Sequence, residues 1–262
     1  MRAATLWWTA TAAAAAVGLA ADGVPRREAP RINVGGIVNA ATSRPAPDNF
    51  VSPGAIVSIY GAGLSNETRE AGAGDARGGF LPEILGGATV FFGPVAAPLY
   101  YVSPVQINAQ VPAVLLPGEW EVKVRVNSLE GGEKVQVRAY SPGLFGVARH
   151  PDGTLVSRTS PARPGGIVLL FGSGFGTTRP PLHSGELAPE GPTWLDAPVE
   201  AKIGEIALHA EAVLYAGLAP GFAGLYQFNL RVPAAAPEGD LEVLLKVGEE
   251  WTQPGVRIPV AR

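Results

Sequence analysis

The stretch Gln106-Ile107-Asn108-Ala109-Gln110-Val111-Pro112 occurs a second time as Gln227-Phe228-Asn229-Leu230-Arg231-Val232-Pro233. Both copies read Gln-x-Asn-x-x-Val-Pro, with apolar residues at the alternate positions. Alternation with a period of two is typical of a strand with one buried face. The closing proline has no N–H for a sheet hydrogen bond, so it ends that strand. A strand that occurs twice predicts a domain that occurs twice.

The repeat extends to both sides of this strand. Residues 53–63 (PGAIVSIYGAG) match residues 164–174 (PGGIVLLFGSG), and residues 120–126 match residues 241–247 as alternating apolar strands. Short β-type runs alternate with Gly/Pro turns, and no run favours a helix longer than a turn or two. Each copy offers about seven strands, as an immunoglobulin-like sandwich does. The sequence therefore predicts an all-β fold of two tandem immunoglobulin-like β-sandwich domains.

We expect the first domain at residues 32–140 and the second at residues 141–262, because a strand runs out into Ser-Pro-Gly at that boundary. Residues 22–31 are polar and interrupted by proline, which is typical of a linker or mobile arm. Residues 1–20 have the basic start, the Ala-rich apolar run and the small-residue cleavage site of a secretory signal peptide.

The apolar run at the N-terminus is too short to span a bilayer comfortably, so we expect cleavage rather than a retained membrane anchor. This predicts a secreted or extracytoplasmic protein, in the periplasm or at the cell surface, with no membrane span after signal cleavage. The chain has no cysteine. Disulfides and thiolate metal or redox chemistry are therefore excluded, and an exported protein of this kind is held together by its core.

The overall charge argues against one class of partner. Among 262 residues the net charge is −3, and the basic residues are scattered. A protein that binds nucleic acid or an anionic membrane surface carries a basic patch, so neither partner is predicted.

Motifs for catalysis are incomplete. Gly172-Ser173-Gly174 lacks the glycine that a nucleophile elbow needs two residues before the serine, because Phe171 stands there. The same loop lacks the Gly-Lys-Ser/Thr of a phosphate loop. His150, His183 and His209 do not have the paired spacing of a zinc site. We therefore predict no catalytic residues, no cofactor and no metal ligands.

Four amides of the repeated strand are the first polar candidates: Gln106, Asn108, Gln227 and Asn229. Amides on one face of a strand can line a ligand groove. They can also tie down neighbouring loop backbone, because each amide offers both donors and acceptors. If the amides stabilise the fold that both copies share, their presence in both copies is explained. We therefore interpret them as a structural motif.

Aromatic residues supply the candidates for ligand or partner contacts. Trp194 lies in a Gly/Pro-rich loop, Trp251 lies near a hairpin tip, and Phe222 lies in a segment, residues 217–224, that the first copy lacks. Exposed aromatic rings on sandwich loops stack on sugar rings or anchor a protein contact. The alternative is that each ring plugs the end of its own sandwich. Function specific to this chain is expected where the two copies differ.

Further motifs match a known family. They are Val38-Asn39-Ala40-Ala41, Ser52-Pro53-Gly54, Leu85-Gly86-Gly87, residues 97–104 (APLYYVSP), the two Gln-x-Asn strands, residues 141–145 (SPGLF), residues 161–165 (PARPG) and residues 215–221 (YAGLAPG). With these motifs the chain resembles the Solibacter-type C-terminal domain family of acidobacterial exported proteins. The resemblance covers nearly all of residues 32–262. It implies immunoglobulin-like halves of the IPT/TIG type and an uncharacterised function, and it supplies no catalytic residues.

Three functional hypotheses follow from these observations. The first is a non-catalytic exported module for adhesion, scaffolding or assembly, with an unknown protein or glycan of the cell envelope as partner. The second is a carbohydrate-binding module. The third is a hydrolase, which requires converging carboxylates or a Ser/His pair.

Overall fold

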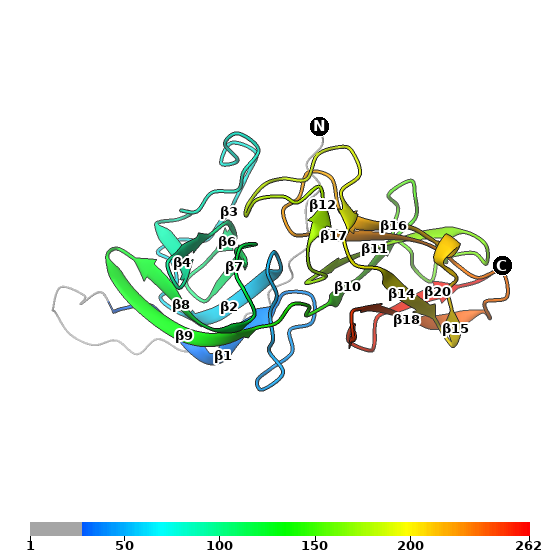
Figure 1. Cartoon of the computed structure of the whole chain (residues 1–262), viewed down its shortest axis with the longest axis horizontal. Helices are drawn as coiled ribbons and strands as arrows, with labels where there is room; N and C mark the ends of the chain where they lie inside the picture. Colours follow the sequence, from blue (N-terminus) through cyan, green and yellow to red (C-terminus); the bar gives the residue numbers. More distant parts are fainter. Residues whose placement is uncertain (1–27) are drawn as a thin grey trace.

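The computed structural model describes residues 28–262 as two β-sandwiches side by side (Figure 1). Each sandwich consists of two antiparallel sheets, and the one helix within the described residues is the 3-10 turn η1 (Ala210–Ala212). The predicted all-β fold of two tandem immunoglobulin-like sandwiches is confirmed. The predicted signal peptide, residues 1–20, lies outside the described residues.

The first sandwich has one sheet in the order β1-β2-β7-β6-β3 and a second in the order β5-β4-β8-β9. Its strands are β1 (Arg31–Asn39), β2 (Ile56–Ala62), β3 (Arg69–Glu70), β4 (Ala88–Phe92), β5 (Val95–Ala97), β6 (Leu99–Val102), β7 (Gln106–Gln110), β8 (Gly118–Val126) and β9 (Leu129–Val137).

The second sandwich repeats this topology, with sheets β10-β11-β17-β16-β13-β12 and β15-β14-β18-β19 and with β20 also paired to β18. Its strands are β10 (Gly143–Arg149), β11 (Ile167–Ser173), β12 (Thr178–Arg179), β13 (Trp194–Leu195), β14 (Val199–Ile203), β15 (Ile206–Ala207), β16 (Val213–Leu218), β17 (Tyr226–Arg231), β18 (Gly239–Val247), β19 (Glu250–Trp251) and β20 (Arg257–Val260). The two Gln-x-Asn strands are β7 and β17, which hold equivalent places in their sheets.

Each sandwich has its own hydrophobic core, and the period-two pattern supplies it. Ile107 and Ala109 of β7 are fully buried in the first core, as are Phe228 and Leu230 of β17 in the second. Burying one such large side chain stabilises the fold by about 1.5–3 kcal/mol. The alternate residues of both strands therefore face away from the cores.

The last strand differs between the two copies. In the first sandwich β9 pairs with β8 without interruption from Gly118 to Val126. In the second, residues 252–256 separate β19 from β20, and Gln253 lies in that gap. The Gln253 side chain donates to the carbonyl of Ala41 at 3.4 Å and accepts from the N–H of Leu144 at 3.1 Å. The interruption thus supplies a contact to the first sandwich.

Buried hydrogen bonds join the two sandwiches at what we call the junction. The Ile56 N–H donates to Ser173 Oγ at 2.7 Å, and the Asn39 amide donates to the carbonyl of Ser141 at 2.7 Å. Ser173 and Asn39 are almost completely buried. Ser173 is therefore a junction residue, which agrees with the prediction that it is not a nucleophile.

Equivalent loops of the two copies also pair with each other across the junction. The Leu81 N–H donates to Gly185 O, and the Leu187 N–H donates to Gly79 O, both at 2.8 Å. Gln110, the last residue of β7, accepts from the Gly185 N–H at 2.6 Å through its side chain. The first of these loops joins β3 to β4, and the second joins β12 to β13.

Apolar side chains complete the junction. Ile56, Ala219 and Leu225 form a buried cluster that spans both halves, and Phe222 is among the partly buried residues packed on it. The Tyr100 hydroxyl donates to the carbonyl of Ala223 at 2.7 Å and accepts from its N–H at 2.8 Å. Burial raises the pKa of Tyr100, so this hydroxyl stays protonated. The segment found only in the second copy, residues 217–224, therefore packs against the first sandwich.

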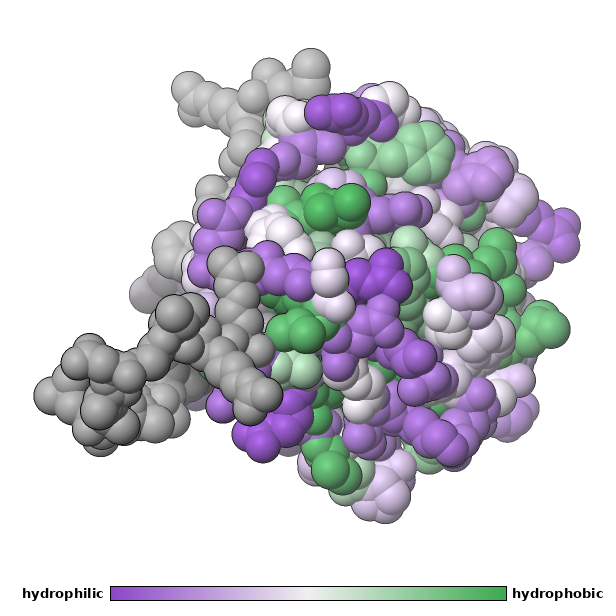
Figure 2. Space-filling view, turned by 90° about the vertical axis from the view of Figure 1, so that its left-hand side faces the viewer, coloured by the Kyte–Doolittle hydropathy of each residue, from purple (hydrophilic) through white to green (hydrophobic). Residues whose placement is uncertain are grey.

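The outer end of the first sandwich has a mixed surface. On the part of this face that is not grey in Figure 2, hydrophobic side chains lie in small separate groups among hydrophilic ones. Hydrophobic residues that are exposed singly are normal for a soluble domain and do not indicate a docking site.

We predict that Ser173→Ala lowers the free energy of unfolding by about 1–3 kcal/mol, because it leaves the buried Ile56 N–H without an acceptor. Ser160→Ala is the matched control. Ser160 is exposed, so its replacement should change stability by less than about 0.5 kcal/mol. Urea unfolding of both variants measures the difference, and equal losses would contradict the role of Ser173.

Candidate functional site

The strongest candidate site lies on the outward side of the β17 sheet. Phe228 and Leu230 face the core, so Gln227 and Asn229 face outward, and both are partly exposed. The strand register places Asn229 opposite Tyr215 of β16, and it places Gln227 opposite Gly217. Residues opposite each other in an antiparallel pair project to the same face.

One further step across the sheet reaches β13, which lies between β16 and the edge strand β12, and there Trp194 lies opposite Gly217. Trp194, Tyr215, Gln227 and Asn229 therefore share one side of the sheet, which we call the amide–aromatic face. The structure brings together two sets of residues that the sequence predicted separately, a loop tryptophan and a strand pair of amides.

The two amides of this face bind each other. Gln227 Nε2 donates to Asn229 Oδ1 at 2.9 Å, because residues two apart on a strand lie on the same face. Within the described residues, Gln227 Oε1 and Asn229 Nδ2 have no hydrogen-bond partner in the protein. One acceptor and one donor are thus free to bind a ligand.

In the first sandwich the asparagine of the same pair is closed off from solvent, while Gln106 stays partly exposed. Gln106 Nε2 donates to Asn108 Oδ1 at 2.9 Å, and Ser58 Oγ donates to the same oxygen at 3.0 Å. Asn108 is completely buried and its Nδ2 has no partner among the described residues. The two copies therefore share the amide pair, but only the second exposes its asparagine.

The predicted scaffold role of the amides needs a correction in its detail. Gln106, Asn108, Gln227 and Asn229 make their hydrogen bonds within the sheet face rather than to loop backbone. Gln110 is the amide that binds loops: its Nε2 donates to Gly54 O at 3.2 Å, and its Oε1 accepts from the N–H of Gly185. Gln110 lies at the end of β7, where the loops begin, whereas the other amides lie within the ladder.

Tyr215 forms the floor of the aromatic part of the face. Its hydroxyl donates to Leu218 O at 2.7 Å, so the ring lies along the sheet over Gly217. A Cβ at Gly217 would lie 2.6 Å from the Tyr215 hydroxyl and 2.1 Å from Thr193 O, so only glycine fits there. Trp194 packs against the Tyr215 ring with centroids 4.9 Å apart. These contacts hold the tryptophan in place.

Tyr215 was not a candidate from sequence. Its motif was visible, but its position beside Trp194 depends on the register of three strands, β13, β16 and β17. Partial burial raises the pKa of Tyr215, which keeps the hydroxyl protonated as a donor.

Charge near the face is balanced. Arg179 of β12 lies opposite Trp194 in the sheet register. Its guanidinium forms an ion pair with Asp196. The two amides of the face are neutral, and Arg231, the next outward residue of β17, donates to Gly165 O.

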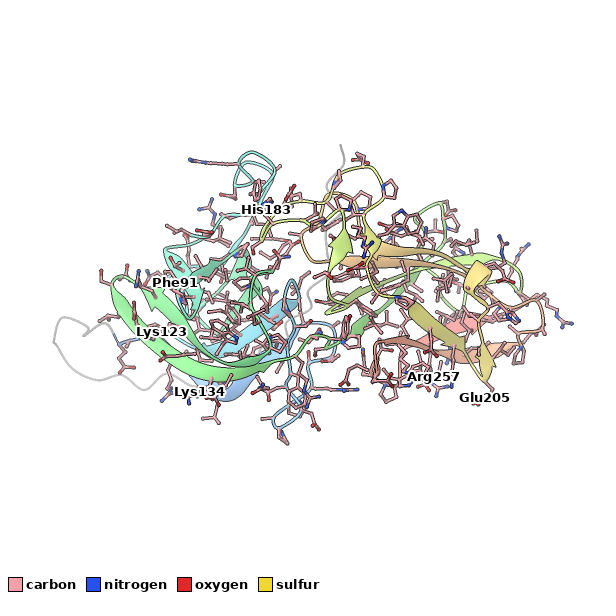
Figure 3. The ribbon with its side chains drawn as sticks, in the orientation of Figure 1. Phe91, Lys123, Lys134, His183, Glu205 and Arg257 are labelled. Carbon is pink, nitrogen blue, oxygen red and sulfur yellow. The ribbon has the colours of Figure 1, made fainter. Side chains whose placement is uncertain are left out.

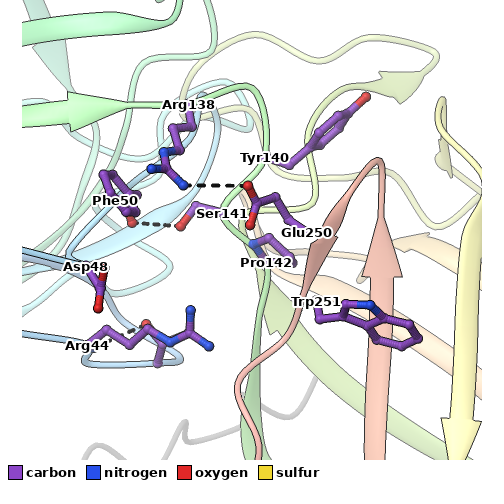
Figure 4. Close-up of a pocket in the computed structure, with 10 residues that line it drawn as sticks. Arg44, Asp48, Phe50, Arg138, Tyr140, Ser141, Pro142, Glu250 and Trp251 are labelled. Atoms are coloured by element: carbon purple, nitrogen blue, oxygen red, sulfur yellow. Dashed lines mark hydrogen bonds and ion pairs between the residues drawn. The ribbon is translucent and has the colours of Figure 1, made fainter.

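Trp251 lies elsewhere, at the edge of the junction. It lines a cavity of about 130 Å³ between the sandwiches, together with Phe50, Arg138 and Glu250 (Figure 4). The Arg138 guanidinium lies over the Phe50 ring and 3.6 Å from the Glu250 carboxylate. Lys202 Nζ lies 4.9 Å from the centre of the Trp251 ring. Trp251 is partly buried, and its role as a ligand contact stays a prediction.

Phe222 is not part of the amide–aromatic face either. It packs on the junction cluster, so its partners within this chain are residues of the two sandwiches. A role for Phe222 in binding a further molecule stays a prediction. Of the three aromatic candidates, Trp194 is the one that lies on the amide–aromatic face.

The three histidines and the charged residues are spread over the molecule. Figure 3 places His183 above the junction, Lys123 and Lys134 on the first sandwich, and Glu205 and Arg257 on the second. The Glu186 carboxylate accepts from the His183 backbone N–H at 2.9 Å and lies 3.0 Å from the His183 ring, and these contacts lower the pKa of Glu186. Within residues 28–262 no group of three or more His, Asp or Glu side chains is placed to hold a metal ion.

One Ser/His contact resembles what a hydrolase requires. His150 Nε2 lies 3.3 Å from Ser160 Oγ, but it lies closer, 3.1 Å, to the carbonyl oxygen of the same residue. A ring nitrogen that donates to a carbonyl cannot also accept the serine proton. The nearby Asp152 carboxylate binds the N–H and hydroxyl of Thr154, which lowers its pKa, rather than orienting the imidazole. The geometry therefore favours support of an exposed loop over catalysis.

Among the described residues no helix is long and apolar enough to cross a membrane. No family model matches the chain, and neither does any curated protein. The resemblance to the Solibacter-type family therefore stays a prediction.

Several solved structures are distantly similar. SGBP-B of the Bacteroides ovatus mixed-linkage glucan utilization locus, in complex with a mixed-linkage heptasaccharide, is 12% identical with a TM-score of 0.34; the match covers 84% of this chain and 45% of that one. SGBP-B from a Bacteroides uniformis xyloglucan utilization locus is 14% identical with a TM-score of 0.29, covering 88% and 50%. Domains 5–6 of the S-layer protein SbsC are 12% identical with a TM-score of 0.28, covering 88% and 98%. The chain spans about half the length of the two SGBP-B structures, and overlaps this low carry no argument about function.

We predict that Tyr215→Phe destabilises the protein by about 1 kcal/mol at neutral pH, because the hydrogen bond to Leu218 O is lost. The raised pKa of Tyr215 means that the folded state favours the neutral hydroxyl. Its contribution is complete below the ordinary value of 10.0 and is lost as the pH rises through the raised pKa. The stability difference between wild type and variant should therefore shrink above pH 10. Urea unfolding from pH 7 to 11 measures this, and a difference in the free energy of unfolding between wild type and variant that stays constant over that range would contradict the prediction.

Proposed function

We propose that this protein is a non-catalytic exported module that binds or scaffolds at the cell envelope, with its two sandwiches acting as one stiff unit. The observation that carries the proposal is the junction. It combines side-chain hydrogen bonds, paired loop backbones and a shared apolar cluster, as the contacts of Ser173, Gln110 and Ile56 illustrate.

The connection between the sandwiches supports stiffness. β9 ends at Val137 and β10 begins at Gly143, so the linker is short. The Ser141 hydroxyl, within that linker, donates to Phe50 O at 2.7 Å. Domains joined by a short, hydrogen-bonded linker and a partly apolar interface have little freedom to move independently. A stiff pair of sandwiches can hold a binding surface at a fixed distance from its attachment.

Export is the second part of the proposal and rests on the sequence. The signal-like residues 1–20 and the resemblance to acidobacterial exported proteins with IPT/TIG-type halves support an extracytoplasmic location. We place the domains at residues 32–140 and 141–262, because a strand ends in Ser-Pro-Gly at that boundary. The partner at the envelope is a protein or a glycan.

A carbohydrate-binding module is the second candidate function. The observation that favours it is Trp194, which is 47% exposed although it is a large aromatic side chain. An indole held open to solvent is suited to stacking on the apolar face of a sugar ring.

We predict that Phe222→Ala loosens the junction and lowers the free energy of unfolding by about 2 kcal/mol, less than the 3–5 kcal/mol typical of a fully buried phenylalanine. Small-angle X-ray scattering should fit wild type as one rigid particle and the variant as a mixture of more open arrangements. Leu155→Ala is the control, because Leu155 is 52% exposed and away from the junction. Flexible scattering from wild type itself would overturn the stiff-unit proposal.

A further inference from the structure

We propose that the amide–aromatic face binds a neutral, extended polysaccharide, with one sugar ring stacked on Trp194 and the hydroxyls of a neighbouring sugar bound by Gln227 and Asn229. This inference deepens the proposed binding function, on which it rests, by giving it a site and a ligand chemistry.

The first argument is the exposure of an aromatic ring that is already held in place. Trp194 is 47% exposed, yet its position is fixed by the Tyr215 ring, and Tyr215 is in turn anchored through its hydroxyl. Fixing an aromatic side chain before binding reduces the entropy lost when a ligand stacks on it. β13 is paired on both sides, by β16 and β12, and the exposed part of the indole is open to solvent above the sheet.

The second argument is the pair of unsatisfied amide groups. Gln227 Oε1 accepts and Asn229 Nδ2 donates, and neither has a partner among the described residues. A sugar hydroxyl both donates and accepts, so adjacent hydroxyls match one acceptor beside one donor. Arg179 is paired with Asp196, and the amides that would meet the ligand are neutral. Arg231, the next outward residue of β17, donates to Gly165 O through its guanidinium.

The distance between the two parts sets the minimum ligand size. Trp194 and Gln227 are two strands apart, with β16 between them. At a strand spacing of about 4.8 Å, the backbones of their strands are about 10 Å apart. One pyranose ring is too small to bridge that gap, so the ligand has at least two sugar units. Extended β-1,4-linked chains, whose sugar rings present apolar faces, are long enough to reach both parts.

The first sandwich does not offer a second site of this kind. Asn108 is completely buried, and Ser58 already occupies its oxygen. Each chain should therefore bind a glycan at one site, in the second sandwich.

The test is isothermal titration calorimetry of the whole purified protein with cellohexaose, mannohexaose and xylohexaose, and with glucose, mannose and xylose. We expect at least one hexasaccharide to bind with one site per chain and the monosaccharides to bind at least tenfold more weakly. Trp194→Ala and the double variant Gln227→Ala/Asn229→Ala should each weaken hexasaccharide binding tenfold or more. Phe80→Ala, a matched exposed aromatic at 39% exposure, and Gln106→Ala, the equivalent amide in the first sandwich, should leave it unchanged.

The possible negative results distinguish failure of the assigned glycan site from failure of the proposed function on which it rests. Binding that survives Trp194→Ala but is lost in Trp251→Ala would overturn the assigned site and leave a binding module. No binding by any of the three hexasaccharides would overturn the inference, while rigid scattering would still support the stiff unit. Cleavage of a hexasaccharide, seen as new reducing ends, would overturn the non-catalytic function itself. Circular dichroism and urea unfolding verify that each variant is folded. The Trp194→Phe variant, which keeps an aromatic ring, should retain part of the affinity for the hexasaccharide.

Discussion

The hydrogen bond from the Ile56 N–H to Ser173 Oγ fixes how the two sandwiches meet. A buried backbone N–H without an acceptor costs about 1–3 kcal/mol, so this contact strongly favours one arrangement. Ile56 starts β2 and Ser173 ends β11, which means that one strand end of each first sheet is held against the other. Tyr100, Gln110 and the paired loops then lie within reach of their partners.

The junction also explains how two copies of one domain came to differ. Ser173 corresponds to Ala62, and residues 217–224 have no counterpart in the first copy. The final strand is continuous in the first sandwich, and in the second it is interrupted at Gln253, which bonds across the junction. Three of the differences between the copies thus serve their attachment to each other, whereas Trp194 lies on the amide–aromatic face. The residues that differ between the two copies therefore fall into two groups. Some join the two sandwiches, and others are free to bind a further molecule.

Sequence reasoning succeeded where the signal was local. Period-two alternation located β7 and β17, and the matched segments predicted two sandwiches of the same topology. The amides, expected to hold loop backbone, instead bond to each other, because side chains two apart on a strand lie on the same face. Sequence reasoning also treated residues 217–224 as a place for function, although Phe222 packs at the junction. Tyr215 was missed, since its neighbour Trp194 is two strands removed from the amides.

The sequence by itself determined the all-β class, the duplication, and which side of each repeated strand faces a core. These follow from alternation and from proline and glycine, whose effects act within a few residues. Only the tertiary structure decided which copy exposes the asparagine of its amide pair. Asn108 and Asn229 occupy equivalent positions in nearly identical motifs, yet one is completely buried and the other is partly exposed. Their burial depends on what packs over the outer face of each sheet, and those neighbours come from distant parts of the chain.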